Sequence, residues 1–208
     1  MKIAILLYEN MTALDAIGPY EVLSRLPGAE VSFVAAEPGL VRTDTGFLRL
    51  EATRGISEVP EADVLLVPGG PGDEAVRSHA KTLEWIRGVH GGTRFTTSVC
   101  TGSLILAAAG VLDGLRATSH WTSLEELRAL GAEPTSERVV EQGKVITAAG
   151  VSSGIDMALR LAEKIAGRDF AMALQLGIEY DPQPPFDAGS PGKAPPHVVD
   201  IVKGVMAR

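Results

Sequence analysis

The stretch Arg94-Phe95-Thr96-Thr97-Ser98-Val99-Cys100-Thr101-Gly102-Ser103 decides the fold, because a strand pattern changes into a helix pattern within it. Residues 94–99 are rich in β-branched and aromatic side chains, which is typical of a buried strand. The Ala/Leu-rich residues 104–109 predict a helix that ends at Gly110. Cys100, the only cysteine of the chain, therefore lies at the turn between a strand and a helix.

This position suits a nucleophile. Small neighbours permit a sharp turn that exposes the Cys100 side chain, with backbone N–H groups facing the reacting atom. The positive end of the following helix dipole is expected to favour the thiolate. The alternative is a buried structural cysteine, which is the common fate of a lone free thiol. The small residues on both sides of the turn favour the nucleophile.

Strand and helix patterns alternate along the rest of the chain, and a small hairpin is expected over residues 40–52. Short apolar strands separated by helices predict an α/β fold, a doubly wound and mostly parallel sheet with helices on both faces. We expect one domain over residues 1–208, in which the Pro/Gly-rich residues 181–196 form surface coil. Further buried strands are predicted at 2–7, 31–36 and 63–67, short strands at 139–140 and 145–147, and further helices at 13–25, 82–89, 122–130, 151–166 and 170–180.

Composition limits the function classes. An apolar fraction of 45% over 208 residues and a mean hydropathy of +0.15 fit a packed globular protein. The net charge is −7 and no Lys/Arg-rich run is present, so nucleic-acid binding is not expected. A single cysteine suits a reducing cytoplasm. The first apolar run is too short for a signal peptide, and no segment is long enough to span a membrane, so a cytoplasmic protein is expected.

Asp15 follows the first predicted strand and should reach the same sheet edge as Cys100. Thr12 and Asp15 have the spacing of a capping box, in which Asp15 serves the backbone of its own helix. Beside Cys100, Asp15 is instead a candidate proton donor, because an apolar pocket and a nearby thiolate both raise the pKa of a carboxyl. The two interpretations are compatible, since each can use one carboxyl oxygen.

Other groups expected at this edge include Gly69 and Gly70, whose backbone N–H groups, with that of Thr101, could stabilise a developing anion. The alternative is an ordinary turn. His120 is a candidate base for Cys100, although a structural histidine is the more common case. Four scattered histidines and one cysteine give no metal-ligand spacing, so no metal site is expected.

Several motifs resemble the ThiJ/PfpI superfamily, with its flavodoxin-like, class I glutamine amidotransferase-like fold, over nearly the whole chain. Asp15, where the ThiJ-like and glyoxalase branches commonly have Glu, and the tail motif make the isocyanide hydratase branch the most similar. PfpI-type proteases have His where this chain has Thr101, so peptidase activity is set aside. The motifs are Leu14-Asp15-x-x-Gly18-Pro19, Pro68-Gly69-Gly70, Ser98-Val99-Cys100-Thr101-Gly102-Ser103, Ala117-Thr118-Ser119-His120-Trp121, Gly150-Val151-Ser152-Ser153-Gly154-Ile155-Asp156 and Pro184-Pro185-Phe186-Asp187-Ala188-Gly189-Ser190-Pro191.

The resemblance implies a cofactor-free hydro-lyase. The Cys100 thiolate would attack the terminal carbon of an isocyanide while Asp15 protonates the substrate, which gives a thioimidate. Water held by Thr101 and backbone amides would then add and release an N-substituted formamide. No redox step occurs, so no cofactor is expected.

The resemblance also implies that Gly150, Val151 and Ser152 line the pocket with their backbone, and that the protein is a homodimer. Ile17, Trp121 and Val151 are candidates to line an apolar pocket for the substituent of the isocyanide. Two alternatives remain open. One is cofactor-free glyoxalase chemistry on 2-oxoaldehydes, and the other is a non-enzymatic redox sensor that uses Cys100.

Overall fold

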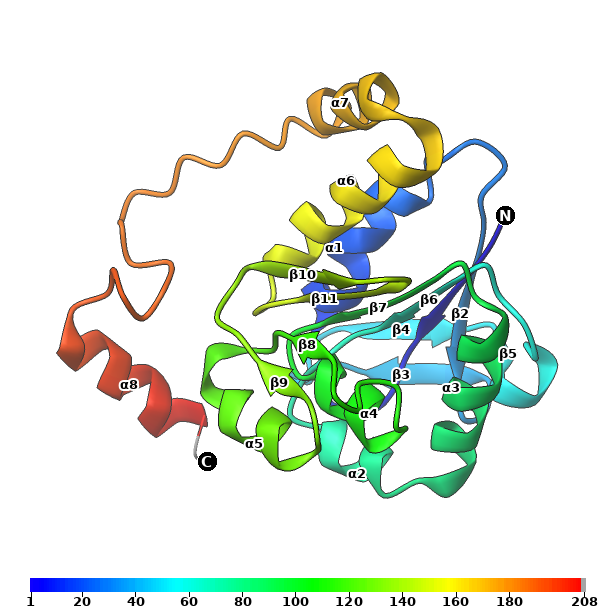
Figure 1. Cartoon of the computed structure of the whole chain (residues 1–208), viewed down its shortest axis with the longest axis horizontal. Helices are drawn as coiled ribbons and strands as arrows, with labels where there is room; N and C mark the ends of the chain where they lie inside the picture. The colour runs from blue at the N-terminus through cyan, green and yellow to red at the C-terminus, as the bar shows by residue number, and fades with distance from the viewer. Residues whose placement is uncertain (207–208) are drawn as a thin grey trace.

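The computed structural model of the protein describes residues 1–206, so residues 207–208 of the expected 1–208 domain lie outside the described residues. A seven-stranded sheet forms its centre, with the strand order β10-β11-β7-β6-β1-β2-β5 (Figure 1). All neighbouring pairs are parallel except β10 and β11. The strands are β1 (Lys2–Leu6), β2 (Glu30–Ala35), β5 (Arg54–Gly55), β6 (Val64–Val67), β7 (Phe95–Val99), β10 (Val139–Gln142) and β11 (Val145–Ala148).

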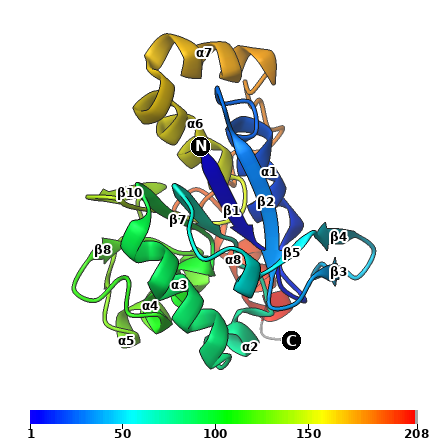
Figure 2. The ribbon, with the colours of Figure 1, turned by 90° about the vertical axis from the view of Figure 1, so that its right-hand side faces the viewer.

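Helices cover both faces of this sheet (Figures 1 and 2), which confirms the predicted doubly wound class. Central strands such as β6 are buried along their whole length, because helices lie above and below them. On one face are α1 (Ala13–Leu23) and α6 (Ser153–Ala166), with α7 (Arg168–Gly177) packed against α6. On the other face are α2 (Asp73–Arg77), α3 (Ala80–Gly92), α4 (Gly102–Ala108) and α5 (Leu124–Ala129).

Smaller elements surround the sheet. The expected hairpin is present as β3 (Gly39–Arg42) and β4 (Arg49–Ala52), which pair antiparallel. Two-residue strands β8 (Arg116–Ala117) and β9 (Glu133–Pro134) pair in parallel. Short 3-10 helices span Ile56–Glu58 and Trp121–Ser123. None of the helices described has the length and apolar character needed to cross a membrane.

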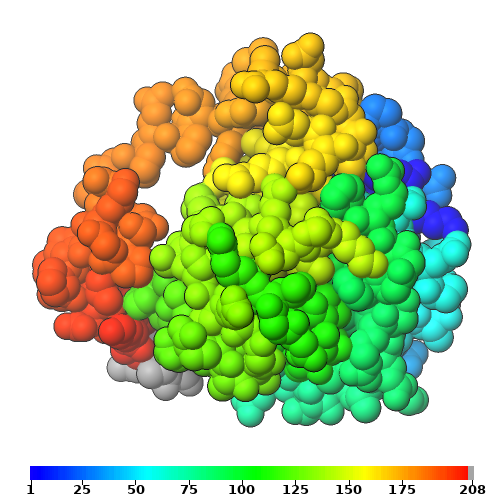
Figure 3. All heavy atoms as spheres, in the orientation of Figure 1, coloured from blue at the N-terminus to red at the C-terminus, as the bar shows by residue number. Residues whose placement is uncertain are grey.

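Two helices were not predicted from the sequence. One is α2, which has five residues and follows a Gly/Pro-rich turn. The other is α8 (Pro196–Met206), which comes after the coil. Residues 181–193 are all exposed, and Figure 3 shows this segment as an arch with an opening between it and the rest of the molecule. The expected surface coil is therefore present, but it does not lie flat on the sheet and its helices.

The topology determines where a site can form. After β1 the chain runs to β2 on one side, and it later returns to place β6 on the other side of β1. Ligands of open α/β sheets bind beyond the carboxyl ends of strands at such a switch point. Cys100 follows β7, and the turn at Gly69 and Gly70 follows β6, so both lie at this edge.

Candidate active site

Cys100 occupies a strained turn between β7 and α4. Its φ is +58°, a conformation that non-glycine residues rarely adopt outside functional turns. The backbone N–H of Cys100 donates to the carbonyls of Ala148 and Ala149, at 3.1 and 2.9 Å. Its carbonyl accepts hydrogen bonds from the hydroxyls of Ser103 and Ser119, each at 3.1 Å. These four bonds hold the turn in the conformation that a nucleophile elbow requires.

Glycines allow neighbouring backbones to approach this turn closely. A Cβ on Gly69 would lie 2.9 Å from the Cβ of Cys100, and a Cβ on Gly102 would overlap the carbonyl oxygen of Val67. The turn after β6 and the turn after β7 can therefore touch only because both positions lack a side chain.

The environment of the thiol differs from the one expected. Cys100 is buried, and burial, followed by the Asp15 carboxylate, raises the pKa of its thiol well above the ordinary value. Hydrogen bonds from the backbone N–H groups of Val151 and Thr101 act in the opposite direction but do not outweigh burial. Burial therefore opposes the thiolate that the helix dipole is expected to favour.

Asp15 lies fully buried in α1, beside Cys100. One carboxyl oxygen, Oδ2, accepts a hydrogen bond of 2.9 Å from the N–H of Gly69, while Oδ1 has no fixed partner among the described residues. Burial raises the pKa of Asp15 to about 7, against the opposing effect of hydrogen bonds from Gly69 and Cys100. The carboxyl and the thiol therefore form a buried pair that can share a proton near neutral pH.

The capping box is not formed. Thr12 is the residue before α1, but its side chain makes no cap hydrogen bond and donates instead to Asp44 at 2.8 Å. Asp15 consequently has no capping role, and its Oδ2 instead accepts the hydrogen bond from Gly69.

The N–H groups of Gly69 and Gly70 both donate hydrogen bonds within the protein. That of Gly69 donates to Asp15, and that of Gly70 donates to the hydroxyl of Thr101 at 2.9 Å. The Thr101 hydroxyl in turn contacts the carbonyl of Gly70 at 3.3 Å. The two glycines thus orient Asp15 and Thr101, in place of the predicted donation to a substrate anion.

The segment 150–152 lies opposite the elbow. Val151 has a φ of +31°, which is unusual for a β-branched residue, and its N–H donates toward the Cys100 sulfur. A Cβ on Gly150 would lie 2.7 Å from the His120 ring, so the glycine allows the two segments to meet. The Ser152 hydroxyl accepts a hydrogen bond from Arg138 at 3.3 Å.

His120 is close to the site but does not pair with the thiol. Its Nδ1 lies 2.7 Å from the hydroxyl of Thr122, and no hydrogen bond between His120 and Cys100 is found within residues 1–205. Burial lowers the pKa of His120, which favours the neutral ring. The geometry therefore supports the structural interpretation of His120 over that of a base for Cys100.

Two cavities meet at His120 and Val151, which line both. The first, of about 640 Å³, contains Cys100 and Thr101. The second, of about 810 Å³, is lined by Gly150, Ser152 and Trp121, with residues 189–192 of the tail on its far side. Ile17 lines neither cavity.

Sequence reasoning missed several residues of the Cys100 cavity, namely Thr12, Asp44, Asp73, Lys203 and Val205. Asp73 was detectable, because it closely follows β6 and so lies at the same edge as Gly69. Thr12 directly precedes α1. Asp44 comes from the hairpin connection, and Lys203 and Val205 come from α8, so the positions of these three depend on tertiary packing. Most of the missed residues add polar side chains to a cavity whose wall is otherwise mostly apolar. Within the described residues, no group of three or more His, Cys, Asp or Glu side chains could hold a metal ion.

Comparisons with known proteins identify the family of this chain. The model of the DJ-1/PfpI family matches residues 1–164. An isonitrile hydratase of Pseudomonas putida is 45% identical over 200 residues, which cover 96% of this chain and 87% of that protein. The crystal structure of a ThiJ/PfpI family protein from Pseudomonas syringae has a TM-score of 0.96 and 40% identity, covering 99% of this chain and 86% of that one. The deglycase PfpI of Pyrococcus furiosus is 29% identical over 148 residues, or 71% of this chain and 89% of that protein.

Proposed function

This chain belongs to the DJ-1/PfpI family, and we propose that within it the protein is a hydro-lyase that converts isocyanides, also called isonitriles, to N-substituted formamides. Similarity to the isonitrile hydratase of Pseudomonas putida extends over nearly the whole chain. The observation that carries the proposal is the buried pair of Asp15 and Cys100, because this reaction needs a soft nucleophile and a weak acid in one dry site.

The reaction begins with the proton that the pair shares. Ionised Asp15 accepts the proton of the Cys100 thiol, and the thiolate sulfur forms a bond to the terminal carbon of R–N≡C. The same proton then passes from Asp15 to that carbon, which gives the thioimidate R–N=CH–S on Cys100. The thiol needs no low pKa in the resting protein, since its base lies beside it.

Hydrolysis of the thioimidate completes the cycle. Water adds to the carbon, its second proton passes to the nitrogen, and the carbon–sulfur bond breaks as R–NH–CHO forms. The proton of the new hydroxyl group returns to the pair of Asp15 and Cys100. We assign the orientation of this water to Thr101. This role is supported by the hydrogen bond that its hydroxyl accepts from Gly70 and by its place in the cavity wall.

The backbone N–H groups of Val151 and Thr101 support the sulfur whenever it carries negative charge. Both donate toward Cys100 and lower the pKa of its thiol. They therefore stabilise the thiolate during attack and again when the thioimidate collapses.

A redox sensor is less well supported. Reversible oxidation needs an exposed thiol with a lowered pKa. Cys100 is 4% exposed, and burial raises the pKa of its thiol.

The tail supports a homodimer. Phe186 is 77% exposed, and Ile201 and Val205 of α8 are 61% and 67% exposed. These apolar side chains lie along or beyond the arch whose opening is visible in Figure 3. A second copy that occupies this opening would cover them and fix α8 at the Cys100 cavity.

A cytoplasmic location fits the single reduced thiol.

The test is a substrate panel at neutral pH. The purified protein is incubated with an aryl isocyanide, an alkyl isocyanide and methylglyoxal in water enriched in oxygen-18. The proposal predicts N-substituted formamide that carries one labelled oxygen, and slow or no consumption of methylglyoxal. Rapid turnover of methylglyoxal with none of either isocyanide would instead support the glyoxalase alternative.

A further inference from the structure

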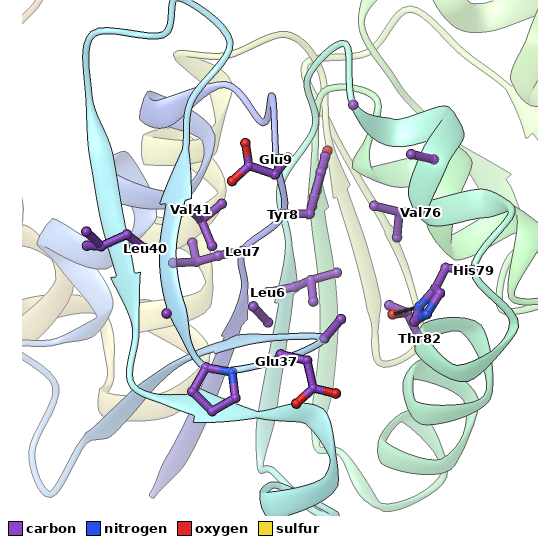
Figure 4. Close-up of a pocket in the computed structure, with 16 residues that line it drawn as sticks. Leu6, Leu7, Tyr8, Glu9, Glu37, Leu40, Val41, Val76, His79 and Thr82 are labelled. Atoms are coloured by element: carbon purple, nitrogen blue, oxygen red, sulfur yellow. Dashed lines mark hydrogen bonds between the residues drawn. The ribbon is translucent and has the colours of Figure 1, made fainter.

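A third cavity, of about 370 Å³, shares no lining residue with the Cys100 cavity or with the 810 Å³ cavity beside it. It lies between the β3–β4 hairpin on one side and α2 and α3 on the other, above the carboxyl ends of β1 and β2 (Figure 4). A volume of this size is typical of a small-molecule site. Its place beside the switch point at β1 is also one where α/β sheets bind ligands.

Small residues create the space. Ala35, Ala36, Gly39, Gly72 and Ala75 line the cavity where larger side chains would fill it. At Gly72 a side chain is impossible without rearrangement, because its Cβ would overlap the carbonyl oxygen of Glu9. Apolar side chains form much of the remaining wall, among them Leu7, Val41 and Val76, which Figure 4 shows around the same space.

The polar side chains at the floor and the α3 wall are engaged within the protein. The Tyr8 hydroxyl donates to the carbonyl of Pro68 at 2.9 Å, and Nδ1 of His79 lies 2.7 Å from the Thr82 hydroxyl. The hydrocarbon part of a ligand would therefore meet few competing polar groups.

The charged side chains around the cavity indicate which kind of ligand it can bind. Among the residues that the structure describes, Glu9 and Glu37 line the cavity and no Lys or Arg does. Glu9 is engaged by Arg42, through its backbone N–H at 3.1 Å and its guanidinium at 3.6 Å. Glu37 has neither an ion pair nor a hydrogen bond to any of residues 1–205, and so leaves a free carboxylate beside an apolar cavity.

We propose that this cavity is a second binding site, for a small primary amine with a compact hydrocarbon group. The ammonium group lies at the Glu37 carboxylate, and the hydrocarbon group packs against Leu7, Val41 and Val76. This site is independent of the hydratase chemistry at Cys100.

Benzylamine and benzyl alcohol are the probes, because they have nearly the same shape and differ in charge at neutral pH. Binding to the full chain is measured by isothermal titration calorimetry at pH 7.5 and low salt, where electrostatic interactions are least screened. We expect one benzylamine per chain, and about threefold to fivefold weaker binding of the alcohol, which cannot form the ion pair with Glu37. Equal affinities, or no binding of the amine, would overturn the proposal.

Variants locate the bound amine. Ala75→Phe fills the cavity from an exposed position of α2 and should abolish binding, while Glu37→Gln should weaken it about threefold to fivefold, as loss of an exposed ion pair does. Asp44→Asn, which removes a carboxylate from the Cys100 cavity, is the matched control and should leave the affinity unchanged. Sensitivity to Asp44→Asn alone would place the amine in the Cys100 cavity and contradict the proposal.

Two controls separate folding and catalysis from binding. Thermal unfolding shows whether Ala75→Phe is folded, and Glu37→Gln tests the site without added volume. Cys100→Ser should bind benzylamine with the same affinity as the wild type, because Cys100 lies in a different cavity. Amine binding and isocyanide hydration are therefore tested independently of each other.

Discussion

At the scale of single residues, the chemistry depends on one proton held between Asp15 and Cys100. Replacement of Asp15 by Asn keeps the size and an oxygen acceptor for Gly69 but removes the acid and base. We expect kcat/KM for an isocyanide to fall about 10²–10⁴-fold, as for the loss of a general acid–base group. Steady-state kinetics of Asp15→Asn measure this effect, and activity within fivefold of the wild type would exclude the role.

The pH profile of the wild type follows from the same pair. Asp15 must be ionised to accept the thiol proton, and its pKa is raised to about 7. We therefore expect kcat/KM to fall about tenfold per pH unit below pH 7 and to level off above it. A rate that is constant from pH 5 to pH 8 would contradict this assignment.

The raised pKa of Asp15 also makes the stability of the folded protein depend on pH. Between the ordinary value of 3.8 and about 7, folded Asp15 keeps a proton that the unfolded chain has lost, so its contribution to stability falls as pH rises through this window. Asn cannot ionise. Asp15→Asn should thus be about 2–4 kcal/mol more stable than the wild type at pH 8, and similar to it near pH 4. Urea unfolding at both pH values measures this difference, and a variant less stable at pH 8 would refute it.

At the scale of elements, the contact between the turn after β6 and the start of α4 requires glycine. Gly102→Ala places a methyl group against the carbonyl oxygens of Val67 and Pro68 in a buried position, so we expect a loss of about 3 kcal/mol or more. Gly88→Ala in α3 is the control, because nothing lies within 4 Å of the added methyl group. It should stabilise the protein by up to about 1 kcal/mol. Equal stability of the two variants by urea unfolding would be inconsistent with the close contact.

The elements that could be predicted are those with a strong local pattern. The run 94–99 is rich in β-branched and aromatic residues, and residues 95–99 form β7 as expected. By contrast, α2 has only five residues after a Gly/Pro-rich turn, and α8 follows a long coil, so neither has enough local signal. The Thr12–Asp15 spacing gave two interpretations, and the tertiary contact with Gly69 decided between them.

The site was predictable for the same reason, but only in part. Asp15 and Cys100 follow strands of a parallel sheet, so topology alone brings them to one edge. Two features of the site depend on packing between distant elements. The N–H groups of Gly69 and Gly70 donate to side chains of the protein, and Asp44 and Lys203 line the cavity. No local pattern encodes such contacts.

At the scale of the whole molecule, the open arch of the tail leads to a prediction about assembly. Sedimentation equilibrium should give a mass about twice that of the 21.8 kDa chain. Ile201→Asp, in the exposed face of α8, should shift the protein toward monomer and lower kcat/KM, because α8 lines the Cys100 cavity.

The control for this variant is Ala80→Asp, which adds the same single negative charge at the exposed start of α3, away from the tail (Figure 1). It should leave the mass unchanged. A wild type that stays monomeric at micromolar concentration would refute the proposed homodimer.

The central claim is that Cys100 is the nucleophile of isocyanide hydration. The most direct test compares formamide formation from one isocyanide by the wild type and by Cys100→Ser, with thermal unfolding to verify that both are folded. We predict that the variant retains less than about one-thousandth of the wild-type rate, as for other enzymes that lose their nucleophile. A folded Cys100→Ser variant that retains more than a tenth of the rate would contradict the account.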